Sequence, residues 1–203
     1  MAATIIEPGY VEASAGNAPF WRRPDRANLF SERAQRFKHL ATDHRLADFL
    51  LFMAAVAEAQ HQVLSDQGPA ILPGTEQLDL CKTHGMPPLN HQSHQRSPEW
   101  RAGLHLLMTH IAEHANPATR SSIAQIQALP DHELEKLADR ILAGEYANRD
   151  LAVAPLVGAA LQVYWARMSA ALDTSAVHRS EMQNSCPACG AAPSVSVVRI
   201  GGA

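Results

Sequence analysis

Residues 150–172 read DLAVAPLVGAALQVYWARMSAAL, an almost continuously apolar run. At about 1.5 Å per residue, a helix over this run would be some 34 Å long, which is enough to cross a bilayer. However, Pro155, Gln162 and Arg167 interrupt the run. Its uncharged part, residues 151–166, is shorter than the roughly 20 apolar residues that a bilayer requires. We therefore predict the buried central helix of a bundle and no direct insertion into a membrane.

The rest of the composition also favours helices. Hydrophobic residues make up 46% of the chain and charged residues 18%, so there is enough apolar surface to form a core. Aromatic residues make up only 5% while alanine is plentiful, which favours packed helices over a β-sandwich. Apolar residues at helical spacing predict further helices over residues 28–42, 43–65, 97–115, 116–129 and 133–143.

Particular residues mark where these helices begin and end. Asn28 and Ser97 are of the types that cap helix N-termini, and Asn116 precedes a proline at a first helical position. Gly144 is expected to end the helix before it. Residues 66–97 are rich in glycine and proline, so we predict a long loop there without a long element.

The chain divides into four parts on composition. Residues 1–27 contain scattered proline and glycine without apolar periodicity, which predicts a mobile N-terminal arm. Residues 28–172 are expected to form the helical domain. Residues 173–185 turn polar and are predicted to be a linker, and residues 186–203 would start a second, small lobe.

Charge and cysteine content limit the class of protein. The formal net charge of −3 gives no general attraction to nucleic acid, and we expect none as a partner. A locally basic stretch is interpreted as a solvated helix face, with a docking surface for an acidic partner as the alternative. This stretch contains Arg22, Arg23, Arg26, Arg33, Arg36 and Lys38. No secretory or transit signal is visible at the N-terminus, and three cysteines are too few for a disulfide framework, so we expect a cytoplasmic protein.

The motif Cys186-Pro187-Ala188-Cys189-Gly190 is the strongest chemical signal in the sequence. Two cysteines separated by two residues can direct both sulfurs to one metal ion, and the glycine lets backbone N–H groups turn toward the thiolates. The β-prone residues 195–200 resemble the strand that leads away from a knuckle in rubredoxin-like and zinc-ribbon lobes. Such a site needs four ligands, and this segment supplies two. We predict half of a metal site; a thioredoxin-like redox pair and a chance pair of inert thiols are the alternatives.

Histidines offer two competing interpretations. His110, Glu113 and His114 form a His-x-x-Glu-His pattern typical of some zinc-dependent hydrolases, which would need a third ligand such as Glu181. A second set has Cys-x-x-His and His-x-x-His spacing in the proline-rich loop and is interpreted as ordinary loop residues, with a zinc site as the alternative. That set is Cys81, His84, His91 and His94.

The run from Cys186 to Pro193, followed by residues 197–201, resembles the first knuckle of the FdhE accessory proteins. Residues 161–168, 87–89 and 30–37 are also similar to that family, so the resemblance covers nearly the whole chain. It implies a mainly α fold, in which a helical bundle domain precedes two rubredoxin-like lobes with several Cys-x-x-Cys pairs. This sequence contains the first pair, so we expect the chain to stop partway through the first lobe.

The same resemblance implies a function. The protein would be a non-enzymatic accessory protein that binds the catalytic subunit of respiratory formate dehydrogenase in the cytoplasm and supports its maturation. Cys186 and Cys189 would bind iron or zinc in the complete protein, with the site incomplete in this chain. A zinc-dependent hydrolase that uses the His-x-x-Glu-His helix is the alternative function.

Overall fold

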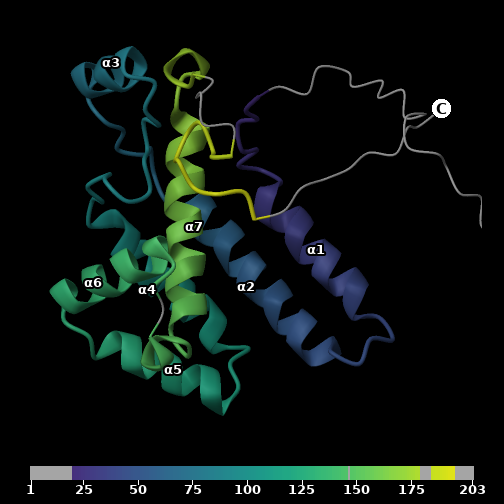
Figure 1. The fold of residues 1–203 in the computed structure, drawn as a ribbon. Helices are drawn as coiled ribbons and strands as arrows, with labels where there is room; N and C mark the ends of the chain where they lie inside the picture. Colours follow the sequence, from purple (N-terminus) through teal and green to yellow (C-terminus); the bar gives the residue numbers. More distant parts are fainter. Residues whose placement is uncertain (1–19, 146, 179–183, 195–203) are drawn as a thin grey trace, which may run out of the picture.

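The computed structural model describes residues 20–145, 147–178 and 184–194, and every regular element among them is helical (Figure 1). The mainly α fold class is therefore confirmed. The strand predicted at residues 195–200 and most of the predicted arm lie outside the described residues. The division into helical domain, linker and lobe stays a prediction. The helices are α1 (Leu29–Ala41), α2 (Ala47–Asp66), α3 (Thr75–Thr83), α4 (Glu99–Ala112), α5 (Pro117–Gln127), α6 (Asp131–Ala143) and α7 (Ala154–Ala171), with the short 3₁₀ turns η1 (Asn148–Asp150) and η2 (Thr174–Ala176).

Helix α7 is the centre of the bundle, as its sequence predicts. It packs against α2, α4 and α6 (Figure 1). Most of its side chains are buried, apart from a strip that includes Pro155 and Gln162, which are exposed. Pro155 lies in its first turn, where the missing N–H would have had no partner within the helix. In the part of the chain that the structure describes, no helix is long and apolar enough to cross a membrane.

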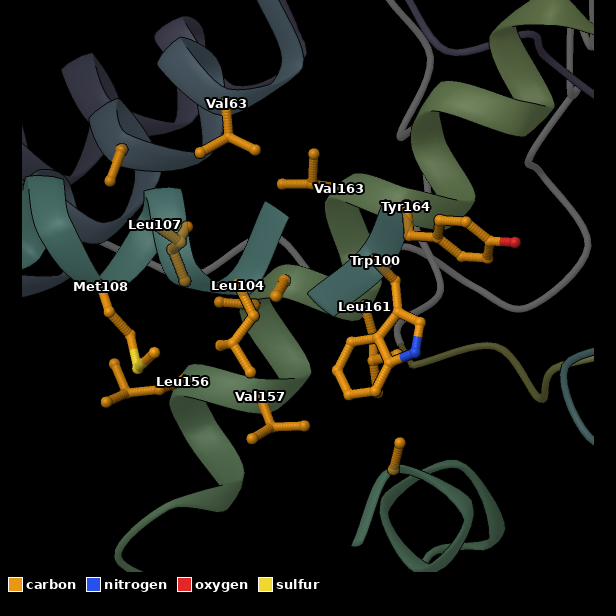
Figure 2. Close-up of a cluster of buried hydrophobic side chains, with 14 of the residues drawn as sticks. Val63, Trp100, Leu104, Leu107, Met108, Leu156, Val157, Leu161, Val163 and Tyr164 are labelled. Carbon is orange, nitrogen blue, oxygen red and sulfur yellow. The ribbon is translucent and has the colours of Figure 1, made fainter. Parts of the chain in front are cut away.

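The hydrophobic core lies mainly between α4 and α7 (Figure 2). Leu104 and Leu107 of α4 and Val157 of α7 are fully buried. Burying a side chain of this size stabilises a fold by roughly 1.5–3 kcal/mol, so this contact contributes much of the stability. Val63 of α2 and Trp100 at the start of α4 extend the same cluster.

Two of the predicted helix ends are confirmed in detail. The side chain of Asn116 accepts a hydrogen bond of 2.8 Å from the backbone N–H of Thr119. Gly144 ends α6 with a φ of +73°, a left-handed conformation that glycine adopts without a steric cost. Both ends are set by local chemistry, which explains why the sequence predicts them.

Two predicted caps are wrong. Asn28 precedes α1, but its side chain donates to Asp25 and makes no capping bond. Ser97 does not cap α4; instead, its backbone N–H donates to the hydroxyl of Tyr164 on α7 at 3.0 Å. The backbone near Ser97 is thus fastened by a tertiary contact.

The long loop predicted over residues 66–97 is also wrong in part, because it contains α3. Gly74 directly precedes this helix, and Gly85 follows it with a φ of +62°. The glycine and proline residues flank the helix and do not interrupt it. They mark its two ends and do not indicate a general absence of structure.

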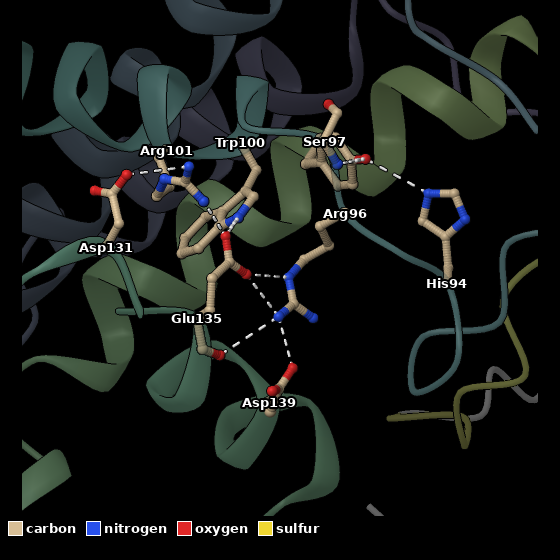
Figure 3. Close-up of polar contacts among 9 residues, drawn as sticks. His94, Arg96, Ser97, Trp100, Arg101, Asp131, Glu135 and Asp139 are labelled. Carbon is tan, nitrogen blue, oxygen red and sulfur yellow. Dashed lines mark hydrogen bonds and ion pairs between the residues drawn. The ribbon is translucent and has the colours of Figure 1, made fainter. Parts of the chain in front are cut away.

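A charged clamp joins α4 to α6 (Figure 3). Glu135 of α6 accepts hydrogen bonds from Trp100 Nε1 at 2.8 Å and from Arg96 at 2.8 Å, and it also pairs with Arg101. Arg96 reaches Asp139 at 2.6 Å, and its side chain is only 7% exposed. The clamp therefore fixes the segment before α4, which leads back into the 86–97 loop.

Candidate metal centre

Cys186 and Cys189 lie in one tight turn, residues 186–191, which we call the cysteine knuckle. The N–H of Cys186 donates to the carbonyl of Ala191 at 2.8 Å, and the N–H of Gly190 donates to the carbonyl of Cys186 at 2.7 Å. Gly190 has a φ of +72°, which explains the glycine at this position. The turn brings the two cysteines close enough for their thiol groups to hydrogen-bond.

The environment of the knuckle favours one thiolate. The hydrogen bond from Cys189 lowers the pKa of Cys186 to about 5 against the opposing effect of burial, and backbone N–H groups of Cys189 and Ala188 and the charge of His91 add to this. The pKa of Cys189 is raised, first by its hydrogen bond to Cys186 and then by burial. Backbone N–H groups directed at sulfur also stabilise metal-bound thiolates. The electrostatics of the turn thus suit a metal ligand.

The knuckle is attached to the helical domain by main-chain hydrogen bonds. Leu89 donates from its N–H to the carbonyl of Ala188 at 2.9 Å, and His91 donates from its N–H to the carbonyl of Cys189 at 2.8 Å. The ring nitrogen Nδ1 of His91 lies 3.0 Å from the same carbonyl of Cys189. Ala188 is only 1% exposed and belongs to the main core cluster. We call these contacts the knuckle seam.

Helix α7 supports the other side of this seam. Trp165 donates from Nε1 to the carbonyl of Leu89 at 2.9 Å, and Leu89 is fully buried. Gly190 packs closely, because a Cβ at this position would lie 3.1 Å from Nδ2 of Asn90 and 3.3 Å from Cγ of Pro87. The position of the two thiols is therefore linked to the central helix through the loop that carries the buried Leu89.

Sequence reasoning does not find the seam. It identifies residues 87–89 only through a family resemblance, and His91 only as a candidate ligand. No local pattern predicts that His91 meets a carbonyl 98 residues later in the chain. The one residue whose type could have pointed to the seam is Gly190, because the lack of a side chain permits close approach of another segment as well as a tight turn.

The described residues place two thiols in one turn, which is half of the four ligands that the predicted site needs. Among them, no group of three or more histidine, cysteine, aspartate or glutamate side chains could hold a metal ion. Two thiols with N–H support fit iron or zinc, which four cysteines commonly bind in small lobes. The metal role of Cys186 and Cys189 stays a prediction.

The hydrolase interpretation is not supported. α4 ends at Ala112, so Glu113 and His114 lie beyond the helix that would have to present them with His110. Both Glu113 and His114 are exposed. Glu181, the suggested third ligand, lies outside the described residues.

The loop set with Cys81 also fails to form a ligand group in the described part of the chain. His91 is held by the knuckle seam. His94 faces Tyr164 and Trp165, with its ring 6.2 Å from that of Trp165 between centroids. His94 therefore connects the loop to α7.

Comparison with known proteins shows which family of sequences this chain resembles. Residues 18–181 match the family model described as FdhE, N-terminal. The chain is 34% identical over 203 residues to the Protein FdhE homolog of Pseudomonas aeruginosa, covering 100% of this chain and 65% of that protein. It is 36% identical over 200 residues to the Protein FdhE homolog of Stutzerimonas stutzeri, covering 98% of this chain and 65% of that protein.

A solved structure agrees with the sequence matches. The crystal structure of the FdhE protein from Pseudomonas aeruginosa superposes with a TM-score of 0.76 at 31% identity, covering 85% of this chain and 60% of that one. The chain therefore spans somewhat less than two thirds of the length of these relatives.

Proposed function

The chain belongs to the FdhE family, and on this premise we propose that it is a non-enzymatic accessory protein needed for formate dehydrogenase activity. It binds the catalytic subunit of formate dehydrogenase in the cytoplasm and supports its maturation. The observation that carries this proposal is the family match over residues 18–181, together with relatives that are similar over the whole chain.

The proposal includes a metal ion, iron or zinc, bound by Cys186 and Cys189 with two further ligands from outside the described residues. The backbone N–H groups around Cys186 support it, because they stabilise a thiolate before and after metal binding. When bound, the metal would cross-link the knuckle to the segment that supplies the remaining ligands. The knuckle seam would transmit that constraint to α7.

Association with the enzyme is the direct test. We expect the tagged chain to co-purify with the catalytic subunit of formate dehydrogenase, with the full-length Pseudomonas aeruginosa homolog as the positive control. If the homolog retains the subunit and this chain does not, the proposed function is wrong for this chain.

Metal content tests the role of the cysteines. In the complete protein, where all four ligands would be present, we expect Cys186→Ser and Cys189→Ser to lower bound iron or zinc after expression in supplemented medium, because each removes a thiolate ligand. Cys81→Ser is the matched control, since Cys81 is a buried thiol outside the knuckle. Equal metal content in all three variants would contradict the assignment.

A further inference from the structure

An open apolar groove separates the α1–α2 hairpin from the first half of α7. Its volume is about 630 Å³, and α1, α2 and α7 form its main walls. Phe37 of α1 and Phe52 and Met53 of α2 line one wall, while Leu151 and Pro155 line the other. We call this feature the hairpin groove.

Apolar side chains continue from the groove toward the tip of the hairpin. Leu40 follows Phe37 by one turn of α1, and Phe49 precedes Phe52 and Met53 by one turn of α2, so these side chains share helix faces. Phe49 is 57% exposed, and Leu151 on the opposite wall is 59% exposed. Large apolar side chains gathered around a groove are typical of an interaction site.

Among the described residues that line the groove, Arg33 is the one that carries a charge. Its Nη1 donates to Oε1 of Gln162 at 3.0 Å, and its guanidinium lies 5.1 Å from the centroid of the Phe30 ring. Over the described ranges, no carboxylate pairs with it. Burial lowers the pKa of Arg33, which means that its charge is poorly solvated there. A carboxylate brought in by a partner would offset that cost.

The lining also limits the form of the partner. Because the walls are helices with apolar side chains, they present few backbone groups to hydrogen-bond an extended peptide, and the described residues contain no strand edge. A helix satisfies its own backbone and can place an apolar stripe in such a groove.

We propose that the hairpin groove binds an amphipathic helix of the formate dehydrogenase catalytic subunit. The apolar stripe of that helix contacts Phe37, Phe52 and Leu151, and an aspartate or glutamate at one end of the stripe pairs with Arg33. The identity of the partner rests on the proposed function; the groove, its exposed side chains and its cation define the chemistry of the docking helix.

The test is a titration of the purified catalytic subunit against the full chain and three variants. Leu151→Asp puts a charge on the apolar wall, and we expect at least about tenfold weaker binding, as for a residue near the centre of an interface. Arg33→Gln removes the cation, and we expect about a fivefold loss that shrinks at high salt. Ile71→Asp is the matched control, because Ile71 is also 59% exposed but lies outside the groove; we expect its affinity to stay within about twofold, as for a residue outside the contact.

Each variant is first checked for native helix content and an unchanged unfolding midpoint, which the high exposure of Leu151 and Ile71 favours. If the unaltered chain binds the subunit and Leu151→Asp and Arg33→Gln bind equally well, the groove proposal is overturned while the proposed function stands. If the unaltered chain fails to bind, the proposed function fails and the partner of the groove fails with it.

Other occupants of the groove would give different results. A lower molar mass of the free chain after Leu151→Asp would show that a second copy occupies the groove. Hydrogen exchange that rises along Phe37 and Phe52 when residues 1–19 are removed would assign the groove to that segment. Binding of the chain to anionic phospholipid vesicles that is lost in Leu151→Asp would assign it to a membrane surface. Each of these results would overturn the proposal.

Discussion

The α4–α6–α7 side of the helical domain and the α1–α2 hairpin differ in how completely their side chains are partnered. Between α4 and α7 the large apolar side chains are fully buried, and nearby Arg96 and Arg101 both pair with Glu135 of α6 (Figures 2 and 3). On the hairpin, Phe49 is exposed, and Arg33 has no carboxylate partner among the described residues. The first side accounts for much of the stability, and the second leaves exposed the surface on which the proposed docking depends.

The ion pairs show the same difference. Lys38 and Glu58 join α1 to α2, but their side chains are 53% and 49% exposed, so the pair contributes roughly 0–1 kcal/mol. Arg167 on α7 is 3% exposed, pairs with Glu99 at 2.6 Å and donates to Gln67 at 2.9 Å. Loss of Glu99 should cost more, because the guanidinium of Arg167 would remain buried with its charge unpaired.

The largest expected effect comes from the core. Leu104→Ala should lower the free energy of unfolding by about 2–5 kcal/mol, because it leaves a cavity between α4 and α7. Phe49→Ala, on the hairpin, should change it by about 0.5 kcal/mol or less. Denaturant unfolding of both variants measures this, and equal losses would break the distinction between the two sides.

Disruption of the charged clamp should give the second largest loss in the free energy of unfolding. Glu135→Ala removes the acceptor of Trp100, Arg96 and Arg101, and we expect a loss of about 2–3 kcal/mol. Glu133→Ala on the same helix is the control, since Glu133 pairs with the exposed Lys136, and a much smaller loss of stability is expected there. Thermal or denaturant unfolding that ranks Glu133 above Glu135 would argue against the clamp.

The knuckle seam gives a third, smaller difference. Gly190 and Gly144 have almost the same positive φ, +72° and +73°, but of the two only Gly190 would bring an added Cβ within 4 Å of other atoms. Gly144→Ala should cost about 1 kcal/mol for conformation alone. Gly190→Ala should cost about 1 kcal/mol more and should raise hydrogen exchange at the Leu89 and His91 amides, which bond to the knuckle. Unchanged exchange at those amides would mean that the seam does not depend on this close approach.

The smallest effect concerns pH. Burial, and then the charge of Arg96, lower the pKa of His94 below its ordinary 6.5, so the unfolded chain binds this proton more readily than the folded one. Stability should therefore fall as pH drops from 6.5 toward the folded pKa, and His94→Gln should remove that part of the dependence. Unfolding midpoints of the unaltered protein and of His94→Gln, measured at a series of pH values, test this. The same dependence of the midpoint on pH in both proteins would contradict it.

Several elements follow from sequence because they depend on neighbouring residues. The apolar run at residues 150–172 predicts a buried α7, and the helix observed over Ala154–Ala171 agrees. Asn116 and Gly144 act through capping and backbone conformation within a few residues. By contrast, the glycines that flank α3 make its segment resemble a loop, and Ser97 resembles a local cap although a tertiary bond to Tyr164 takes its place.

The candidate site divides in the same way. The Cys-x-x-Cys spacing with Gly190 predicts that both thiols share one turn, because that geometry is set within five residues. The sequence alone thus determined the helical class, the central helix and the shared turn of Cys186 and Cys189. Only the tertiary structure decided that His91 and Leu89 hold the knuckle and that Arg33 lies in an apolar groove. These arrangements join residues far apart in the chain, and local periodicity carries no information about which distant segments will pack together.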